Sequence, residues 1–200
     1  MKNYSTGNNI CEYRLLVPFP HQLQEKINNI RKQLHHRHNL LYPFLLPPSL
    51  TILKCHAFEK IEPKLLEKIQ DLVFDTPPFS VELQNFTSFP THTIYVEINS
   101  KAPFNDMIKQ LKKMKWLMNI PGYEPQFIPE PHLIMAQALK PQKFNQMWRD
   151  CENRTLQELF LAESLLLVKR SEHQQFYSTV RRMQLNTLPM NIKQGELLLT

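Results

Sequence analysis

The sequence predicts a single α+β domain built from two similar halves, each with the element order β-α-β-α-β. Its 16 prolines divide the 200 residues into short segments, in which the spacing of apolar residues alternates between strand-like and helix-like periods. Equivalent segments of the two halves begin 79, 83, 83 and 79 residues apart. These offsets indicate an internal duplication over approximately residues 12–90 and 91–170, with a final strand near 176–186.

In the first half, the pattern predicts three strands and two helices. The first helix begins at His21, because one face carries only apolar residues while Gln, Lys, Asn and Arg occupy the other face. Pro63 lies in the first turn of the second helix, where proline is tolerated, and Pro77 and Pro78 close it. The strands are expected at residues 11–17, 49–54 and 79–83.

The second half repeats this order. Residues 91–98 alternate cleanly between apolar and polar side chains, as a half-buried strand does, and Pro103 and Pro141 each open a helix. A further strand is expected at 132–139. Residues 156–168 are too apolar for periodicity to separate strand from helix, but their place in the repeat favours a strand. The methionines of the helix after Pro103 are expected to fill the core: Met107, Met114 and Met118.

The composition excludes several classes of site. Only 3 glycines occur, isolated from one another, so a P-loop, a dinucleotide-binding loop and a nucleophile elbow are all ruled out. Any anion must therefore be bound by side chains. The 3 cysteines are far apart and odd in number, which predicts buried, reduced thiols rather than disulfides or a zinc site. No metal and no cofactor are expected, and His35, His36 and His38 are interpreted as residues that end a helix.

The formal net charge is +6, which is compatible with an anionic partner but identifies none. The N-terminal residues lack an apolar signal segment, and the longest uncharged stretch, 38–53, is interrupted by prolines. We therefore expect a cytoplasmic protein that does not associate with membranes.

The third element of each half carries the residues of most chemical interest. These segments read Pro48-Ser49-Leu50-Thr51 and Pro131-His132-Leu133-Ile134. Because side chains alternate along a strand, Ser49 and Thr51 point to one face, as do His132 and Ile134. In a pseudo-symmetric protein these two strands could face each other across a central groove.

Two strands of pattern Pro-His-apolar-Thr-apolar, about eighty residues apart, are typical of the two-histidine phosphoesterase superfamily, which includes the 2'-5' RNA ligases and cyclic phosphodiesterases. The sequence resembles this family over about residues 13–185. The resemblance implies two lobes with mainly antiparallel sheets that line a central cleft. It also implies metal-independent acid–base chemistry on 2',3'-cyclic or 2'-5' phosphodiesters, with two histidines as acid and base and two threonines holding the phosphate.

Both motifs are incomplete in this chain. Ser49 occupies the first histidine position and Ile134 the second threonine position, whereas Thr51 and His132 are retained. A positioned general acid or base contributes about 10² to 10⁴ in rate, so we expect weak or no catalysis. The predicted ligand is a nucleotide or RNA phosphate, bound by Thr51 and His132 with Ser49 as a further hydroxyl. The alternatives are a residual 2',3'-cyclic phosphodiesterase that uses His132, and a non-catalytic scaffold.

Two other histidines are candidates to replace the missing one. His56 lies seven residues after Ser49, which places it on the opposite face of the strand unless a bulge intervenes. His92 begins a different strand. Neither is expected to complete the site.

Several basic and aromatic residues are candidates for contacts beyond the motifs. Tyr177 could stack on a base or pack at an edge. The lysines of the helix after Pro103 are interpreted as a solvated face, with phosphate contact as the alternative: Lys109, Lys112, Lys113 and Lys115. Charges at the edge of the groove are expected from Lys169, Arg170, Arg181 and Arg182.

Overall fold

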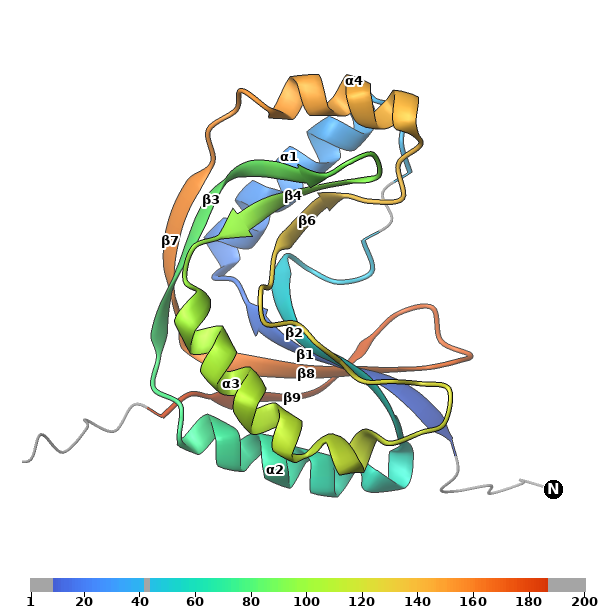
Figure 1. The fold of residues 1–200 in the computed structure, drawn as a ribbon, viewed down its shortest axis with the longest axis vertical. Coiled ribbons are helices and arrows are strands. Elements are labelled where there is room, and N and C mark those ends of the chain that lie inside the picture. The colour runs from blue at the N-terminus through green and yellow to red at the C-terminus, as the bar shows by residue number, and fades with distance from the viewer. Residues whose placement is uncertain (1–8, 42–43, 187–200) are drawn as a thin grey trace, which may run out of the picture.

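The computed structural model describes residues 9–41 and 44–186 (Figure 1). Residues 1–8, on which the expectation about a signal segment rests, and residues 187–200 lie outside this part. The helices are α1 (His21–Arg37), α2 (Glu62–Phe74), α3 (Lys101–Lys113) and α4 (Pro141–Cys151), with short 3-10 helices η1 (Glu59–Ile61) and η2 (Lys115–Met118). The strands are β1 (Ile10–Pro18), β2 (Ser49–Phe58), β3 (Phe79–Phe89), β4 (Thr93–Ile98), β5 (Gln126–Phe127), β6 (Leu133–Ala136), β7 (Gln157–Ala162), β8 (Ser164–Ser171) and β9 (Ser178–Gln184).

The strands form two antiparallel sheets. The five-stranded sheet has the order β5-β2-β1-β8-β9, and the four-stranded sheet has the order β6-β4-β3-β7. The predicted α+β class with mainly antiparallel sheets is therefore confirmed.

The two halves of the sequence are interleaved between the sheets. The first half places β1 and β2 in the five-stranded sheet and β3 in the other, whereas the second half places β4 and β6 in the four-stranded sheet and β8 in the first. The row β2-β1-β8-β9 thus corresponds to the row β6-β4-β3-β7. The predicted boundary between residues 90 and 91 falls inside the β3–β4 hairpin, so each lobe contains strands from both halves.

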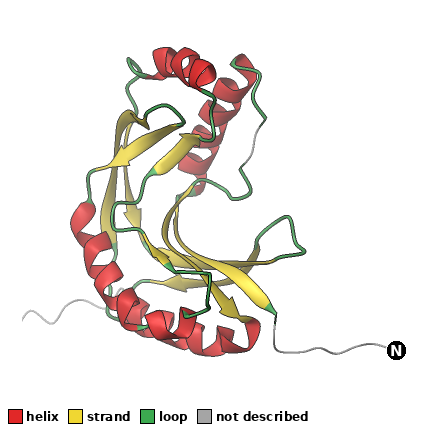
Figure 2. Cartoon of the chain, turned by 45° about the vertical axis from the view of Figure 1, so that its right-hand side comes forward, coloured by secondary structure: helices red, strands yellow, loops and turns green. Residues whose placement is uncertain are grey.

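The helices lie on the outside of a C-shaped molecule (Figure 2). Helix α2 contacts β9 and α3 contacts β5, so both cover the five-stranded sheet, while α1 contacts β6 and α4 contacts β4 in the four-stranded sheet. Each sheet thereby buries one apolar face under two helices, as layered α+β folds require. None of the helices within 9–41 and 44–186 is both long and apolar enough to span a membrane.

The core contains the residues that periodicity assigned to it. Met107, Met114 and Met118 are buried, as predicted. All three cysteines are free and buried. Burial raises the pKa of the Cys55 thiol to about 12 and that of Cys151 to about 11, so both thiols stay protonated at neutral pH.

Two element predictions need correction. Residues 156–168 form not one strand but two, β7 and β8, separated at Glu163 where the chain passes from the four-stranded to the five-stranded sheet. The strand expected at 132–139 ends at Ala136, and Ala138 has a φ of 55°, a conformation that strands do not contain. In both cases tertiary structure decides where the strand ends, and hydrophobic periodicity does not show that end.

Candidate functional site

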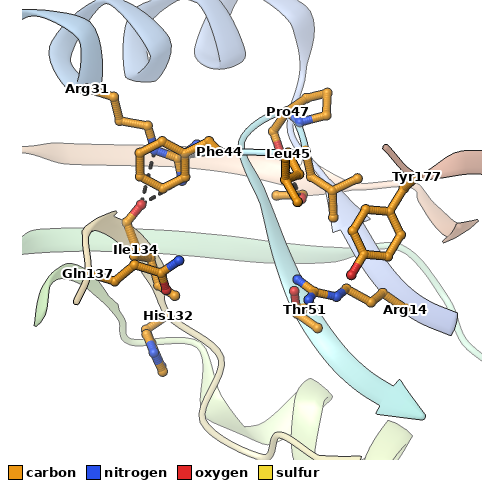
Figure 3. A pocket seen from close by; sticks show the side chains of 12 residues that line it. Arg14, Arg31, Phe44, Leu45, Pro47, Thr51, His132, Ile134, Gln137 and Tyr177 are labelled. Atoms are coloured by element: carbon orange, nitrogen blue, oxygen red, sulfur yellow. Dashed lines mark hydrogen bonds between the residues drawn. The ribbon is translucent and has the colours of Figure 1, made fainter. Parts of the chain in front are cut away.

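A pocket of about 180 Å³ lies where the two sheets face each other (Figure 3). It brings together all four motif positions, with Ser49 and Thr51 from β2 on one side and His132 and Ile134 from β6 and its entry on the other. The other lining residues come from β1, α1, the segment before β2, the segment after β6 and the entry to β9: Arg14, Arg31, Phe44, Leu45, Leu46, Pro47, Gln137 and Tyr177.

A β-bulge shapes the β2 side of the pocket. The register between β1 and β2 shifts so that Leu15 faces Leu53 but Leu16 faces Thr51, which leaves Ile52 as the extra residue. The Ser49 hydroxyl donates to the carbonyl oxygen of Pro47 at 3.0 Å. The Thr51 hydroxyl has no hydrogen-bond partner among the described residues and is available to a ligand.

On the opposite side, aromatic rings hold His132. Its ring centroid lies 4.8 Å from that of Tyr95 and 5.4 Å from that of Phe89. Its Nδ1 lies 3.3 Å from the carbonyl oxygen of Glu130. If Nδ1 carries the proton and donates to that carbonyl, Nε2 is the nitrogen that can exchange protons with a ligand.

Arg31 is a site residue that sequence reasoning missed. The hydrophobic pattern predicts Arg31 on the polar face of α1, but the residue is only 4% exposed. Its Nε and one terminal nitrogen donate to the carbonyl oxygen of Ile134 at 3.1 and 2.6 Å, and its guanidinium lies 4.0 Å from the ring centroid of Phe44. Its position in the helix could have indicated this burial, because residue 31 lies one turn after Ile27 and three residues before Leu34, on the apolar face.

A second missed feature is an ionic network beside Thr51, centred on Glu12. Glu12 accepts hydrogen bonds from Arg14 Nε at 2.9 Å, from the Tyr177 hydroxyl at 2.7 Å and from Arg170 at 2.6 Å. Lys54 Nζ lies 3.8 Å from the same carboxylate. Burial disfavours the charged form of Glu12, but these hydrogen bonds outweigh it and lower its pKa to about 2.

The network leaves a surplus of positive charge near the pocket. Arg14, Lys54 and Arg170 surround the single Glu12 carboxylate. The guanidiniums of Arg14 and Arg170 each lie 4.8 Å from the centroid of the Tyr177 ring, so two cations pack against this ring. Tyr177 therefore lines the pocket in a fixed orientation; that a base stacks on it stays a prediction.

The other basic candidates have different surroundings. Lys169 lies 2.9 Å from Glu59 and 2.8 Å from Glu62. Arg182 donates to the Ser164 hydroxyl at 3.0 Å, and Arg181 lies beside α2. Of the four residues predicted at the groove edge, only Arg170 joins the network beside the pocket.

The lysines of α3 and η2 lie away from the pocket. Lys109 is 74% exposed and lies 3.0 Å from Asp106, and Lys113 donates to Gln110 at 2.6 Å. Lys115 lies 3.4 Å from Glu124. This environment favours the interpretation of a solvated helix face.

The remaining histidines do not line the pocket. His92 Nδ1 lies 2.7 Å from the Thr93 hydroxyl oxygen. His35 Nε2 lies 3.2 Å from the carbonyl oxygen of Met135, and His38 Nε2 lies 3.0 Å from the Asp150 carboxylate, so both connect α1 to the second half. His36 is exposed on the last turn of α1. Within the described part of the chain, no group of three or more His, Cys, Asp or Glu side chains could hold a metal ion.

The bulge changes the position expected for His56. Because Ile52 adds one residue to β2, Lys54 and His56 are both partly exposed, and they line a second cavity next to the Glu12 network. The β-bulge that places His56 on the face of Thr51 is therefore present, although His56 does not line the first pocket.

Comparison with solved structures shows the same fold in bacterial proteins. TT0787 of Thermus thermophilus superposes with a TM-score of 0.59 at 17% identity, covering 87% of this chain and 97% of that one. Escherichia coli LigT complexed with 3'-AMP gives a TM-score of 0.54 at 12% identity, covering 88% and 98%. LigT complexed with phosphate gives 0.55 at 10% identity, covering 90% and 99%.

Among curated proteins, none matches the sequence of this chain. The family model of the 2'-5' RNA ligase superfamily, however, matches residues 19–174, which is most of the chain. This chain therefore belongs to the 2'-5' RNA ligase superfamily.

Proposed function

We propose that the protein binds the phosphate of a nucleotide or RNA end in the pocket between the two sheets, with weak or no catalysis. One observation carries this proposal: Thr51 and His132 come from different sheets, 81 residues apart, and line the same small pocket.

The charge of the pocket supports an anionic ligand. Its described lining residues include Arg14, Arg31 and His132, but no Asp or Glu. Hydrogen bonds from Thr51 and from a charged donor to a phosphate contribute about 1.5 to 3 kcal/mol each. With few glycines, the chain relies on such side chains for anion binding.

The comparisons support the same ligand class. The E. coli LigT structures of similar fold were determined in complex with 3'-AMP and with phosphate. A pocket that carries donors between two corresponding sheets is suited to a ligand of this kind.

The motif substitutions argue against efficient turnover. Hydrolysis of a 2',3'-cyclic phosphate requires one group to take a proton from the attacking water and another to give a proton to the leaving ribose oxygen. His132 can perform one of these steps, whereas the Ser49 hydroxyl is not an effective acid or base at neutral pH. The missing proton transfer would have to involve bulk solvent.

Calorimetric titration with adenosine 3'-phosphate and with inorganic phosphate tests the proposal. Thr51→Val removes a hydroxyl at almost constant volume and is expected to weaken binding by about 10- to 150-fold. Thr179→Val is the matched control, because Thr179 is exposed on β9. Unchanged affinity in Thr51→Val, or no binding by the wild-type protein at millimolar ligand, would contradict the proposal and favour a non-catalytic scaffold.

The geometry of His132 favours one second candidate, a residual phosphodiesterase. Its ring packs against Tyr95 and Phe89, and its Nδ1 lies 3.3 Å from the Glu130 carbonyl oxygen, which leaves Nε2 for proton transfer. Slow turnover of a 2',3'-cyclic nucleotide that disappears in His132→Ala would establish this activity. No turnover at high enzyme concentration would exclude it and leave binding as the function.

A further inference from the structure

A second cavity, of about 400 Å³, lies along β2 beyond the first pocket, which contains Thr51 and His132. Its walls come from β2, from the segment between η2 and β5, and from the first residue of β5: Lys54, His56, Gly122, Tyr123, Glu124 and Gln126. Neither the family motifs nor the proposed function uses any of these residues.

The bulge at Ile52 is the reason that this cavity and the first pocket share one side of the five-stranded sheet. Without the extra residue, strict alternation would direct Lys54 and His56 away from the face that Thr51 occupies. Thr51 and Lys54 are three residues apart, which is about 10 Å along a strand. One or two nucleotides of a single strand can span this separation.

The Glu12 network joins the two cavities. Arg14 and Tyr177, which line the first pocket, both donate to Glu12, and Lys54, which lines the second cavity, lies 3.8 Å from the same carboxylate. In the β1–β2 ladder, Arg14 faces Lys54 and Glu12 faces His56. The Glu12 network, with its three cations, therefore extends from one cavity to the other.

The second cavity combines a cation with aromatic rings. The Tyr123 and His56 ring centroids are 4.2 Å apart, with an angle of 43° between the planes. Burial lowers the pKa of His56, so at neutral pH this pair is an uncharged aromatic surface. A Cβ atom added at Gly122, which has a φ of +84°, would meet nothing within 4 Å, so there is open space beside the tyrosine.

We propose that this cavity is a second nucleotide subsite, in which a base stacks on Tyr123 while Lys54 contacts the phosphate that joins it to the nucleotide in the first pocket. The proposal rests on the proposed function and specifies its ligand class, a single-stranded oligonucleotide rather than a mononucleotide. Aromatic stacking and one lysine per phosphate are the usual means of binding single strands without reading sequence. Among the described residues, two ionic side chains line the cavity: Glu124, whose carboxylate lies 3.4 Å from Lys115, and Lys54, which supplies the positive charge.

The test compares a five-nucleotide RNA that carries a 3'-phosphate with adenosine 3'-phosphate, by fluorescence anisotropy competition on the full chain. We expect the wild-type protein to bind the RNA at least about 10-fold more tightly than the mononucleotide. Tyr123→Leu should weaken RNA binding by about 5- to 150-fold and change mononucleotide affinity by less than about 2-fold. Tyr123→Phe keeps the ring and should retain the wild-type affinity for both.

Lys54→Met provides an independent variant. Loss of one phosphate contact should reduce the slope of log K against log salt concentration by about 0.7 for the RNA, and leave it unchanged for the mononucleotide. The matched control is Lys64→Met with Trp116→Leu, a lysine and an aromatic ring 4.7 Å apart on the outer helices, which should change neither ligand's affinity.

The outcomes separate the two proposals. Equal affinity of the wild-type protein for both ligands, or equal losses for both in Tyr123→Leu, would overturn the second subsite and leave phosphate binding intact. If neither ligand binds at millimolar concentration, the proposed function fails and the subsite fails with it.

Discussion

The two walls of the pocket have corresponding backbones but different chemistry. The wall from the five-stranded sheet carries Ser49 and Thr51, with the cationic Glu12 network beside them. The wall from the four-stranded sheet carries His132, held by aromatic rings, and the apolar Ile134. The two walls therefore differ in chemistry, because one carries hydroxyls and cations while the other carries the single motif histidine that the chain retains.

The backbone groups at the outer edges of β2 and β6 also have different hydrogen-bond partners. β2 pairs with the short β5 at Leu53 and Lys54, so another strand supplies hydrogen-bond partners at these two residues. β6 instead presents the carbonyl oxygens of Ile134 and Met135 to the side chains of Arg31 and His35 from α1. Buried carbonyl groups need partners, and the comparison shows that a helix can supply them where the sheet has no further strand.

The largest effect is expected from a variant that gives both walls the same motif residues. Ser49→His combined with Ile134→Thr restores both motifs, and we expect hydrolysis of a 2',3'-cyclic nucleotide to rise by about 10² to 10⁴, the usual contribution of a positioned acid or base. A steady-state assay of product formation measures this rise. The same double variant with His132→Asn is the control and should lose the gain; no rise at all would show that the walls differ in more than these side chains.

The second-largest effect is expected in the stability of the protein, when the edge of β6 loses its side-chain donor. Arg31→Met leaves the Ile134 carbonyl without its charged donors and should lower the free energy of unfolding by about 1.5 to 3 kcal/mol. For a chain of this size, this corresponds to a decrease in Tm of about 3 to 12 °C, measured by calorimetry. Lys32→Met, at the exposed neighbouring position of α1, should change Tm by less than about 1 °C. Equal stability of wild type and Arg31→Met would mean that this edge needs no such donor.

A smaller effect is expected in the cationic wall, from Glu12→Gln. The Glu12 pKa falls from 4.5 to about 2 in the folded protein, so its contribution to stability is complete above pH 4.5 and is lost as pH falls towards 2. Urea unfolding should therefore show wild type more stable than Glu12→Gln by about 1 to 3 kcal/mol at pH 7. This difference should shrink steadily below pH 4.5, and a difference that does not depend on pH would contradict the assigned cause.

The smallest effect is predicted for the outer lysines. Lys109→Gln with Lys113→Gln removes two charges from the solvated face of α3 and should change the affinity for adenosine 3'-phosphate by less than about 2-fold. Titration at two salt concentrations checks this. A loss as large as that expected for Thr51→Val would shift the binding surface from the pocket to the outer helices.

The sequence was most informative where local patterns and the family motif coincide. Strand alternation and the motif together predicted that Thr51 and His132 would share a groove, and both line one pocket. Their roles in binding stay predictions. The α+β class follows from the alternation of strand-like and helix-like segments, which depends only on neighbouring residues.

The features that could not be predicted depend on distant partners. Arg31 is buried because a carbonyl 103 residues away accepts its hydrogen bonds, and no local pattern encodes that acceptor. The bulge at Ile52 places Lys54 and His56 on the face of Thr51, and its one trace in the sequence is the pair of consecutive apolar residues Ile52 and Leu53. The break at Glu163 likewise depends on which sheet each following strand joins.

The β3–β4 hairpin has a consequence for how the chain folds. Cutting the chain at this hairpin would leave two fragments, each holding strands that belong to both sheets. Neither fragment could assemble a complete sheet alone, whereas the pair could reassemble both. Because each sheet needs strands from both sides of this hairpin, neither sheet can form before the whole chain is present, and the two sheets are expected to fold as one cooperative unit.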